Sequence, residues 1–282
     1  MTSSLIITTY NWPEALARVL ESVMSQSVTP DEIIIADDGS TEETKEVIRQ
    51  YQGRSSIPII HSWQEDNGFR LSRSRNKAIS VAKMDYIIMI DGDMILHHKF
   101  IADHLKHAEK GFFITGKRVK LSAELSQKQF KSPKPLTLFS RGLSRGRENA
   151  FRLAWQPKLM SKTQTTSVEG IHGCNLAFWK ADVLTVNGFN TQFEGWGPED
   201  KEFALRMINS GIKRKRLKYA GIAFHIYHDE SPKTLLEANR AIFEDIQINR
   251  ARWCPLGINE FIAVELPQVD EFDASLVTHS LA

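Results

Sequence analysis

The first 120 residues alternate short apolar runs with amphipathic stretches, and this alternation is the strongest constraint on the fold. Short apolar runs predict strands, whereas apolar side chains recurring every three or four residues predict helices. Near-continuous apolar strands separated by helices indicate β-α-β units, in which a parallel sheet is covered on both faces. We expect strands in SLIITTY, which ends at Tyr10, in EIIIADDGS (32–40), in IPIIHSW (57–63) and in YIIMID (86–91).

The intervening helices carry recognisable ends. Pro13 is typical of the first turn of a helix, and Ser40 with Glu43 three residues later predicts a capping box. A third helix is expected in SRSRNKAISVA (72–82), and a fourth in KFIADHLKHAEKG, closed by Gly111. Because ligands bind beyond the carboxyl ends of parallel strands, we expect the functional side chains directly after these strands.

The composition limits the class of protein. A chain of 282 residues forms one large α/β domain or two small ones, and 41% hydrophobic with 25% charged residues excludes a disordered chain. A net charge of only +2 shows no strong bias toward nucleic acid. The two cysteines, Cys174 and Cys254, are too few for a disulfide framework and indicate a reducing compartment. With no signal segment and no long apolar window, the cytoplasm is the expected location.

Two carboxylates, Asp91 and Asp93, follow the fourth expected strand with only Gly92 between them. Like charges at the end of a buried strand are costly unless a positive group lies nearby. Mg²⁺ and Mn²⁺ bind one or two such carboxylates and complete their coordination with water and substrate phosphates. A structural turn is the alternative. The sequence has no GxxxxGK[ST] segment and no GxGxxG after the first strand, so the fingerprints of a P-loop and of a dinucleotide-binding site are both absent.

The other strand ends carry an aromatic residue and a pair of acids. Tyr10 follows the first strand, and Asp37 and Asp38 follow the second. An aromatic face that stacks and a carboxylate that accepts from a ring N–H suit a nucleobase. A turn and a helix cap remain equally good explanations of these residues.

Beyond residue 116 the alternation breaks. Residues 117–162 hold twelve Lys/Arg against two Glu, and we expect a long, partly mobile connection there. Order returns with a helix entered through Pro198 and closed by Gly211, and a basic segment then leads into a strand ending in FHIYHDE. The last dozen residues have the composition of a tail.

Four segments together resemble family 2 glycosyltransferases of the GT-A fold. IITTYNWPEALARVLESVMSQSVTPDEIIIADDGSTEET, DNGFRLSRSRNKAI and IDGDM resemble the nucleotide-binding half, and GCNLAFWKADVLTVNGFNTQFEGWGPEDKEFALRM resembles the acceptor-side motif of galactosyltransferases and chondroitin-polymerase-type enzymes. The resemblance covers roughly residues 3–120 and 170–230. It implies one continuous α/β domain with a mostly parallel central sheet flanked by helices. Residues 1–120 would bind the nucleotide sugar, 121–165 form a basic connection, and 166–282 bind the acceptor and carry the base.

The resemblance also implies donor-side roles. Asp93 corresponds to the direct ligand of Mn²⁺ or Mg²⁺, and Asp91 to a contact with the ribose or sugar of a UDP-sugar. The uridine contacts of the family correspond to Thr8, Tyr10 and Asp38. The donor-binding helix corresponds to the segment with Arg70 and Arg75, where either guanidinium would offset diphosphate charge and a solvated basic face is the alternative.

On the acceptor side the resemblance assigns the catalytic base to Asp200, which would take the proton of the acceptor hydroxyl in an inverting transfer. Glu199 would contact a sugar, although two acids also suit any helix N-terminus. Trp196 would stack on a sugar, with core packing as the alternative. Pro198 departs from the glycine that the family usually has, and the path of this loop is therefore open.

The remaining assignments concern the metal and the donor sugar. A further metal ligand is expected at His225 or His228 in FHIYHDE, with His225 the better match. Gly173 and Asn175 would shape the donor-sugar site. His172 is a weaker candidate for the pocket.

These assignments predict an inverting, metal-dependent hexosyltransferase that uses a UDP-sugar in the synthesis of lipopolysaccharide or capsule. The alternatives are a nucleotidyltransferase, which would normally carry a glycine-rich basic loop after the first strand, and a non-catalytic binding protein of the same fold. Aromatic interleaving in the basic segment is too sparse for a nucleic-acid partner. That segment is predicted to meet an anionic membrane surface or a lipid-linked glycan acceptor at the inner membrane face, with a solvated loop as the alternative.

Overall fold

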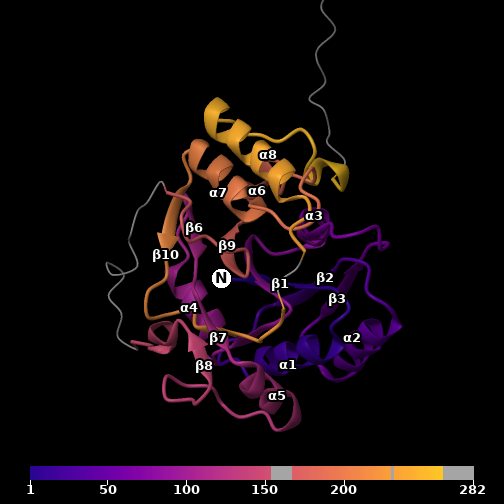
Figure 1. Ribbon diagram of the computed structural model, residues 1–282, viewed down its shortest axis with the longest axis vertical. Helices are drawn as coiled ribbons and strands as arrows, with labels where there is room; N and C mark the ends of the chain where they lie inside the picture. The colour runs from indigo at the N-terminus through magenta and orange to yellow at the C-terminus, as the bar shows by residue number, and fades with distance from the viewer. Residues whose placement is uncertain (154–166, 230–231, 263–282) are drawn as a thin grey trace, which may run out of the picture.

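The computed structural model describes residues 1–153, 167–229 and 232–262. Its centre is a seven-stranded sheet in the order β10-β6-β9-β4-β1-β2-β3 (Figure 1). Only β9 runs opposite to its neighbours, so the expectation of a mostly parallel sheet is confirmed. The strands are β1 (Ser3–Thr9), β2 (Glu32–Asp37), β3 (Ile59–Trp63), β4 (Tyr86–Asp91), β6 (Phe112–Thr115), β9 (Asn175–Trp179) and β10 (Lys213–Arg216).

Helices cover both faces of this sheet because its strands are apolar on both sides. In β1, Leu5 and Ile7 face one core and Ile6 faces the other, as the alternation of side chains along a strand requires. The first core is closed by α1 (Pro13–Met24), α2 (Glu42–Arg54) and α4 (Phe100–His107). The second is closed by α3 (Leu71–Val81), α6 (Lys180–Thr185) and α7 (Glu199–Asn209).

A second, four-stranded sheet lies next to the end of β4. It has the order β5-β11-β7-β8, with β5 (Met94–Leu96), β11 (Ala223–His225), β7 (Arg118–Leu121) and β8 (Leu143–Arg145). β5 begins directly after Asp93, and β11 pairs with it antiparallel so that His225 lies opposite Met94. This pairing joins residues that are about 130 positions apart in the chain.

Part of the basic connection is regular structure. Besides β7 and β8 it contains α5 (Ala123–Lys131) and a short 3₁₀ helix (Arg147–Ala150). Ser122 caps α5 by accepting from the Leu125 N–H, and Leu136 and Leu143 pack in a third apolar cluster with Phe224. Residues 121–153 of the predicted long, partly mobile connection thus include regular elements that the sequence pattern did not predict, and residues 154–165 lie outside the described part.

Two predicted helix ends were also wrong. The side chain of Ser40 accepts from the Asn11 N–H, so the capping box does not form and α2 begins after Thr41. α4 ends at His107, four residues before Gly111. By contrast, α7 begins directly after Pro198 as expected.

The C-terminal part adds a helix that the sequence pattern did not predict. α8 (Leu236–Asn249) packs beside α7 at one end of the molecule, and a 3₁₀ helix (Ile258–Glu260) follows (Figure 1). The expected C-terminal tail lies outside the described residues. In the described part of the chain, no helix is long and apolar enough to cross a membrane.

Candidate active site

A pocket of about 780 Å³ opens beyond the carboxyl ends of β1, β2 and β4. The chain leaves β1 for β2 and β3 on one side and returns to β4 on the other, which is the kind of switch point where open α/β sheets bind ligands. Thr8 and Asp91 are register partners across β1 and β4. Most of the residues assigned from the sequence line this pocket: Thr8, Tyr10, Asp38, Arg75, Asp91, Asp93, Gly173, Trp196, Glu199, Asp200, His225 and His228.

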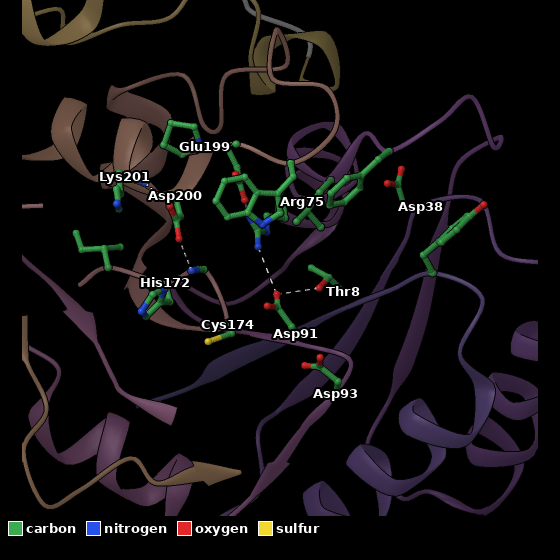
Figure 2. A pocket seen from close by; sticks show the side chains of 18 of the residues that line it. Thr8, Asp38, Arg75, Asp91, Asp93, His172, Cys174, Glu199, Asp200 and Lys201 are labelled. Atoms are coloured by element: carbon green, nitrogen blue, oxygen red, sulfur yellow. Dashed lines mark hydrogen bonds and ion pairs between the residues drawn. The ribbon is translucent and has the colours of Figure 1, made fainter. Parts of the chain in front are cut away.

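Asp91 is bound at the rim of β1 and β4 by two partners. The Thr8 hydroxyl donates to its Oδ1 at 3.1 Å, and Arg75 Nη2 lies 3.3 Å from the same oxygen (Figure 2). Arg75 Nη1 also pairs with Glu199 Oε1 at 3.1 Å. One guanidinium, only 1% exposed, therefore joins the end of β4 to the first turn of α7. At Gly173 a Cβ would come within 2.5 Å of Arg75 Nη2, so that position has no room for a side chain.

The two acids of the GWGPED segment occupy the first turn of α7. Asp200 Oδ2 accepts from the Gly173 N–H at 2.8 Å, and Oδ1 accepts from the Lys201 N–H at 2.7 Å. These two backbone donors fix the carboxylate so that it points into the pocket beside His172 (Figure 2). Burial raises the pKa of Asp200 and of Glu199, and the neighbouring Asp200 charge raises that of Glu199 further. A carboxylate with a raised pKa is a better general base near neutral pH than an exposed one.

Asp93 meets two histidines where the small sheet begins. His225 Nε2 and His228 Nε2 each lie 3.2 Å from Asp93 Oδ2, and the Ile226 N–H donates to the Asp93 carbonyl. Asp93 Oδ1 is buried without a hydrogen-bond partner among the described residues. The three side chains offer ligand atoms that all lie within 4.8 Å of one another.

This donor set fits a divalent ion. One carboxylate and two imidazoles are suited to Mn²⁺, which takes mixed oxygen and nitrogen ligands, and the unpartnered Asp93 oxygen would gain a partner. The sequence left open which histidine is the ligand, and the structure brings both to Asp93. Burial lowers the pKa of His225, so its neutral, metal-binding form is favoured.

The opposite end of the pocket carries the residues assigned to the nucleobase. Asp38 accepts from the Arg70 N–H at 2.8 Å and from Gln64 Nε2 at 2.5 Å, and burial raises its pKa to about 6. Tyr10 is 51% exposed and its hydroxyl donates to Asp66. Asp37 points elsewhere: it is fully buried, pairs with His61 and accepts from a backbone N–H.

The structure corrects the placement of two residues. The Arg70 side chain does not line the pocket and pairs with Glu194, 3.4 Å away. Asn175 is fully buried behind the pocket, where Oδ1 contacts His104 Nε2 and Nδ2 donates to the carbonyls of Lys117 and Gly221. Its side chain joins β9 to the small sheet and is not available to a sugar.

Several lining residues were missed by sequence reasoning. Arg118 and Lys120 lie on the pocket side of β7, and Cys174 accepts from Arg118 at 3.4 Å. The signal for β7 in the sequence was the alternation of basic and apolar residues within RVKL (118–121). α8 contributes a stripe at helical spacing: Leu236, Arg240, Phe243, Glu244 and Gln247.

Comparison with known protein families identifies the chain. The profile of Glycosyl transferase family 2 matches residues 4–180, which is more than half of the sequence. The chain belongs to glycosyl transferase family 2. A second profile, described as the N-terminal domain of galactosyltransferase, matches residues 159–229. The two profiles bear out the resemblance seen in the sequence motifs.

Curated relatives of this family 2 chain include two polysaccharide synthases. Hyaluronan synthase of Pasteurella multocida is 28% identical over 266 residues, which cover 88% of this chain and 26% of the synthase. Chondroitin synthase of Escherichia coli is 26% identical over 260 residues, which cover 87% of this chain and 37% of the synthase. The chain thus spans only 26% and 37% of the length of these two relatives.

Solved structures share the GT-A fold. Staphylococcus aureus TarS (residues 1–349) in complex with UDP-GlcNAc matches with a TM-score of 0.59 and 16% identity, over 82% of this chain and 60% of that one. Mannosyltransferase PcManGT of Pyrobaculum calidifontis, in complex with GDP-Man and Mn²⁺, also has a TM-score of 0.59, with 17% identity over 88% and 64%. The expected fold class is confirmed.

Proposed function

We propose that this chain transfers a sugar from a UDP-sugar to a hydroxyl of a glycan acceptor, with inversion at the anomeric carbon and with a divalent metal ion. The observation that carries the proposal is the position of Asp200. Its carboxylate is held by two backbone N–H groups and faces the same pocket as Asp91 and Asp93. Membership of glycosyl transferase family 2 supports sugar transfer, and the UDP-GlcNAc bound to TarS supports a uridine nucleotide.

In the proposed transfer, separate residues accept the proton and bind the metal ion. Asp200 accepts the proton of the acceptor hydroxyl as that oxygen forms a bond to the anomeric carbon. The bond from the anomeric carbon to the diphosphate oxygen breaks on the opposite side, and UDP leaves with the bonding electron pair. A divalent ion bound by Asp93, His225 and His228 would stabilise the negative charge of the departing diphosphate.

Binding residues hold the substrates around that step. Tyr10 offers an exposed ring for stacking on uracil, and Asp38 accepts from the base N–H. Glu199 contacts a sugar hydroxyl while Arg75 balances its charge and that of Asp91. Trp196, 41% exposed at the pocket, offers a flat apolar face to a sugar ring.

The acceptor we propose belongs to a bacterial surface polysaccharide such as lipopolysaccharide or capsule. Support comes from the two bacterial polysaccharide synthases among the relatives. The basic side chains of residues 117–153 suit an anionic membrane surface and a lipid-linked acceptor. We place the reaction in the cytoplasm or at the inner membrane face, and the free, buried thiols of Cys174 and Cys254 suit that reducing compartment.

The test begins with thermal unfolding of the chain against a panel of nucleotide sugars, with and without Mn²⁺. A ligand at about 100 times its Kd stabilises the folded state by about 2.7 kcal/mol, which shifts the melting temperature by several degrees. We expect a Mn²⁺-dependent shift with one UDP-sugar, and we expect Asp93→Asn to lose it.

Transfer itself is then measured as UDP release with glycan acceptors. Asp200→Asn should retain the UDP-sugar shift and lose transfer by at least about a hundredfold, because an amide cannot accept the proton of the acceptor hydroxyl. A chain that binds UDP-sugars but whose Asp200→Asn variant transfers normally would show that the base is misassigned. A chain that responds to no nucleotide sugar would contradict the proposed function.

A further inference from the structure

One wall of the pocket belongs to α8, which lies beyond both family profiles. The residues that reach the pocket recur at intervals of three and four, so they form one stripe along the helix: Leu236, Arg240, Phe243, Glu244 and Gln247. At 1.5 Å per residue, the stripe from its first to its last member spans roughly 16 Å. That length exceeds a single sugar ring.

α8 is attached to the loop that leads into the catalytic helix. Asn239 is 3% exposed, and its Nδ2 donates to the carbonyl of Glu194 at 2.8 Å and to that of Trp196 at 3.0 Å. At Gly197 a Cβ would lie 2.7 Å from the same nitrogen, so the loop backbone packs directly on this side chain. The stripe therefore has a fixed position relative to Glu199 and Asp200, which begin α7.

The side chains of the stripe are of the kind that bind carbohydrate. Phe243 is half-buried at the pocket, and the more exposed Trp196 lines the same pocket. Glu244 and Gln247 make no hydrogen bond or ion pair with another described residue, so their polar atoms are open to hydroxyl groups. Arg240 pairs with Glu237, and both of these side chains are more than half exposed. Aromatic faces with a few polar groups are typical of small-molecule pockets.

The stripe lies on the acceptor side of the pocket. The donor is assigned to the strand ends, where Asp38 directly follows β2 and Asp91 ends β4. α8 lines the pocket from another element and is attached to the loop that leads to Asp200. The sugar that carries the reacting hydroxyl must sit at Asp200. A wall of this length beside it has room for the next sugar of the same chain.

We propose that the α8 stripe binds the second sugar of the acceptor, with Phe243 stacking on its ring, so that the substrate is an oligosaccharide and not a single sugar. This inference rests on the proposed function. It adds the class of acceptor and assigns acceptor-length specificity to a helix outside the matched family regions. Glu244 and Gln247 then bind hydroxyls of that second sugar.

The experiment compares acceptors of different length. A panel of p-nitrophenyl monosaccharides is screened by UDP release with the UDP-sugar found in the thermal test, and the best one is compared with its homologue extended by one sugar at the reducing side. We expect kcat/KM to be at least about tenfold higher for the disaccharide, which corresponds to about 1.4 kcal/mol. Phe243→Ala should remove this gain, because it should lower kcat/KM for the disaccharide by a larger factor than kcat/KM for the monosaccharide.

Matched variants separate this role from a general effect. Ile248→Ala changes the same helix on its solvent side, where Ile248 is 80% exposed, and should keep the disaccharide gain. Gln247→Ala should lower the gain without affecting folding, since its side chain is exposed. The UDP-sugar melting shift should be unchanged in all three variants.

Two results would overturn the inference while leaving the proposed function intact. One is equal use of the monosaccharide and the disaccharide by the native chain, and the other is a Phe243→Ala variant that loses both activities in the same proportion. Absence of transfer to every acceptor, despite UDP-sugar binding, would instead contradict the proposed function and this inference with it.

Discussion

Arg75 offers the sharpest test of the electrostatics of the site. Its guanidinium lies 3.3 Å from Asp91 and 3.1 Å from Glu199, and its charge opposes the rise that burial causes in the pKa of Asp200. Arg75→Met keeps an unbranched apolar stem but removes the guanidinium and its charge. The variant leaves Glu199 and Asp200 side by side at the start of α7 without their cation.

The size of the effect follows from burial. Removing one partner of a buried ion pair costs about 3–5 kcal/mol, because the remaining charge is left without compensation. Arg75 and Glu199 fall in that class, with side chains 1% and 15% exposed, whereas Asp91 at 30% is better solvated and adds less. We therefore expect Arg75→Met to lower the free energy of unfolding by about 3–5 kcal/mol at pH 8.

The loss should depend on pH with a definite sign. The folded-state pKa of Glu199 is already raised by burial, and without Arg75 it rises further. When folding raises the pKa of a carboxyl group, the free energy of unfolding falls as the pH rises from the unfolded-state pKa of that group to its folded-state pKa. The difference between Arg75→Met and the native chain should therefore be smaller at pH 5 than at pH 8.

Urea unfolding at both pH values, with EDTA present, measures this difference. The double variant Arg75→Met/Glu199→Gln is the control, because neutralising both partners should recover most of the lost stability. A cost below about 1 kcal/mol for Arg75→Met, or a double variant no more stable than the single one, would refute the assignment of Arg75 as the main counter-charge.

Two further predictions concern the strand ends. Uridine, which lacks the diphosphate, should bind the native protein about tenfold more weakly at pH 5 than at pH 8 in titrations without metal, because about one tenth of Asp38 is ionised one unit below its pKa of about 6. Asp38→Asn should bind uridine equally at both pH values. If that variant keeps the pH dependence of the native chain, Asp38 is excluded as its cause. Gly92→Ala should lower stability by about 1–3 kcal/mol and weaken Mn²⁺-dependent UDP binding, since a Cβ there would clash with the Thr8 carbonyl. Gly53→Ala, where an added Cβ meets nothing within 4 Å, should do neither, and equal effects of the two substitutions would contradict the steric argument.

The sequence predicted the parallel core well because that core is built from local patterns. Each of the first four strands is rich in apolar residues, and the acids Asp38, Asp91 and Asp93 at the ends of β2 and β4 reach one pocket because parallel strands end at the same edge. The placement of Asp38, Asp91 and Asp93 required no knowledge of long-range pairing.

The failures arise where a side chain has a choice of direction or of partner. Asn175 begins β9, and the alternation along a strand left open whether it faced the pocket or the core. Arg70 precedes a helix, and its long side chain reaches Glu194 in place of the pocket. α8 was missed because a mixed stripe on an exposed helix resembles an ordinary solvated surface.

The structure also explains why two aspartates two residues apart are tolerated at the end of β4. Asp91 is the last residue of β4 in the large sheet, and its side chain pairs with Arg75. Asp93 directly precedes β5 of the small sheet, and its side chain pairs with His225 and His228. Gly92 between them lies against the Thr8 carbonyl, where a side chain has no room. The two carboxylates therefore have separate partners, a fixed guanidinium for one and a pair of imidazoles for the other. It follows that Asp93 depends on the pairing of β5 with β11, and that changes in the small sheet should alter metal affinity while leaving the Asp91–Arg75 pair in place.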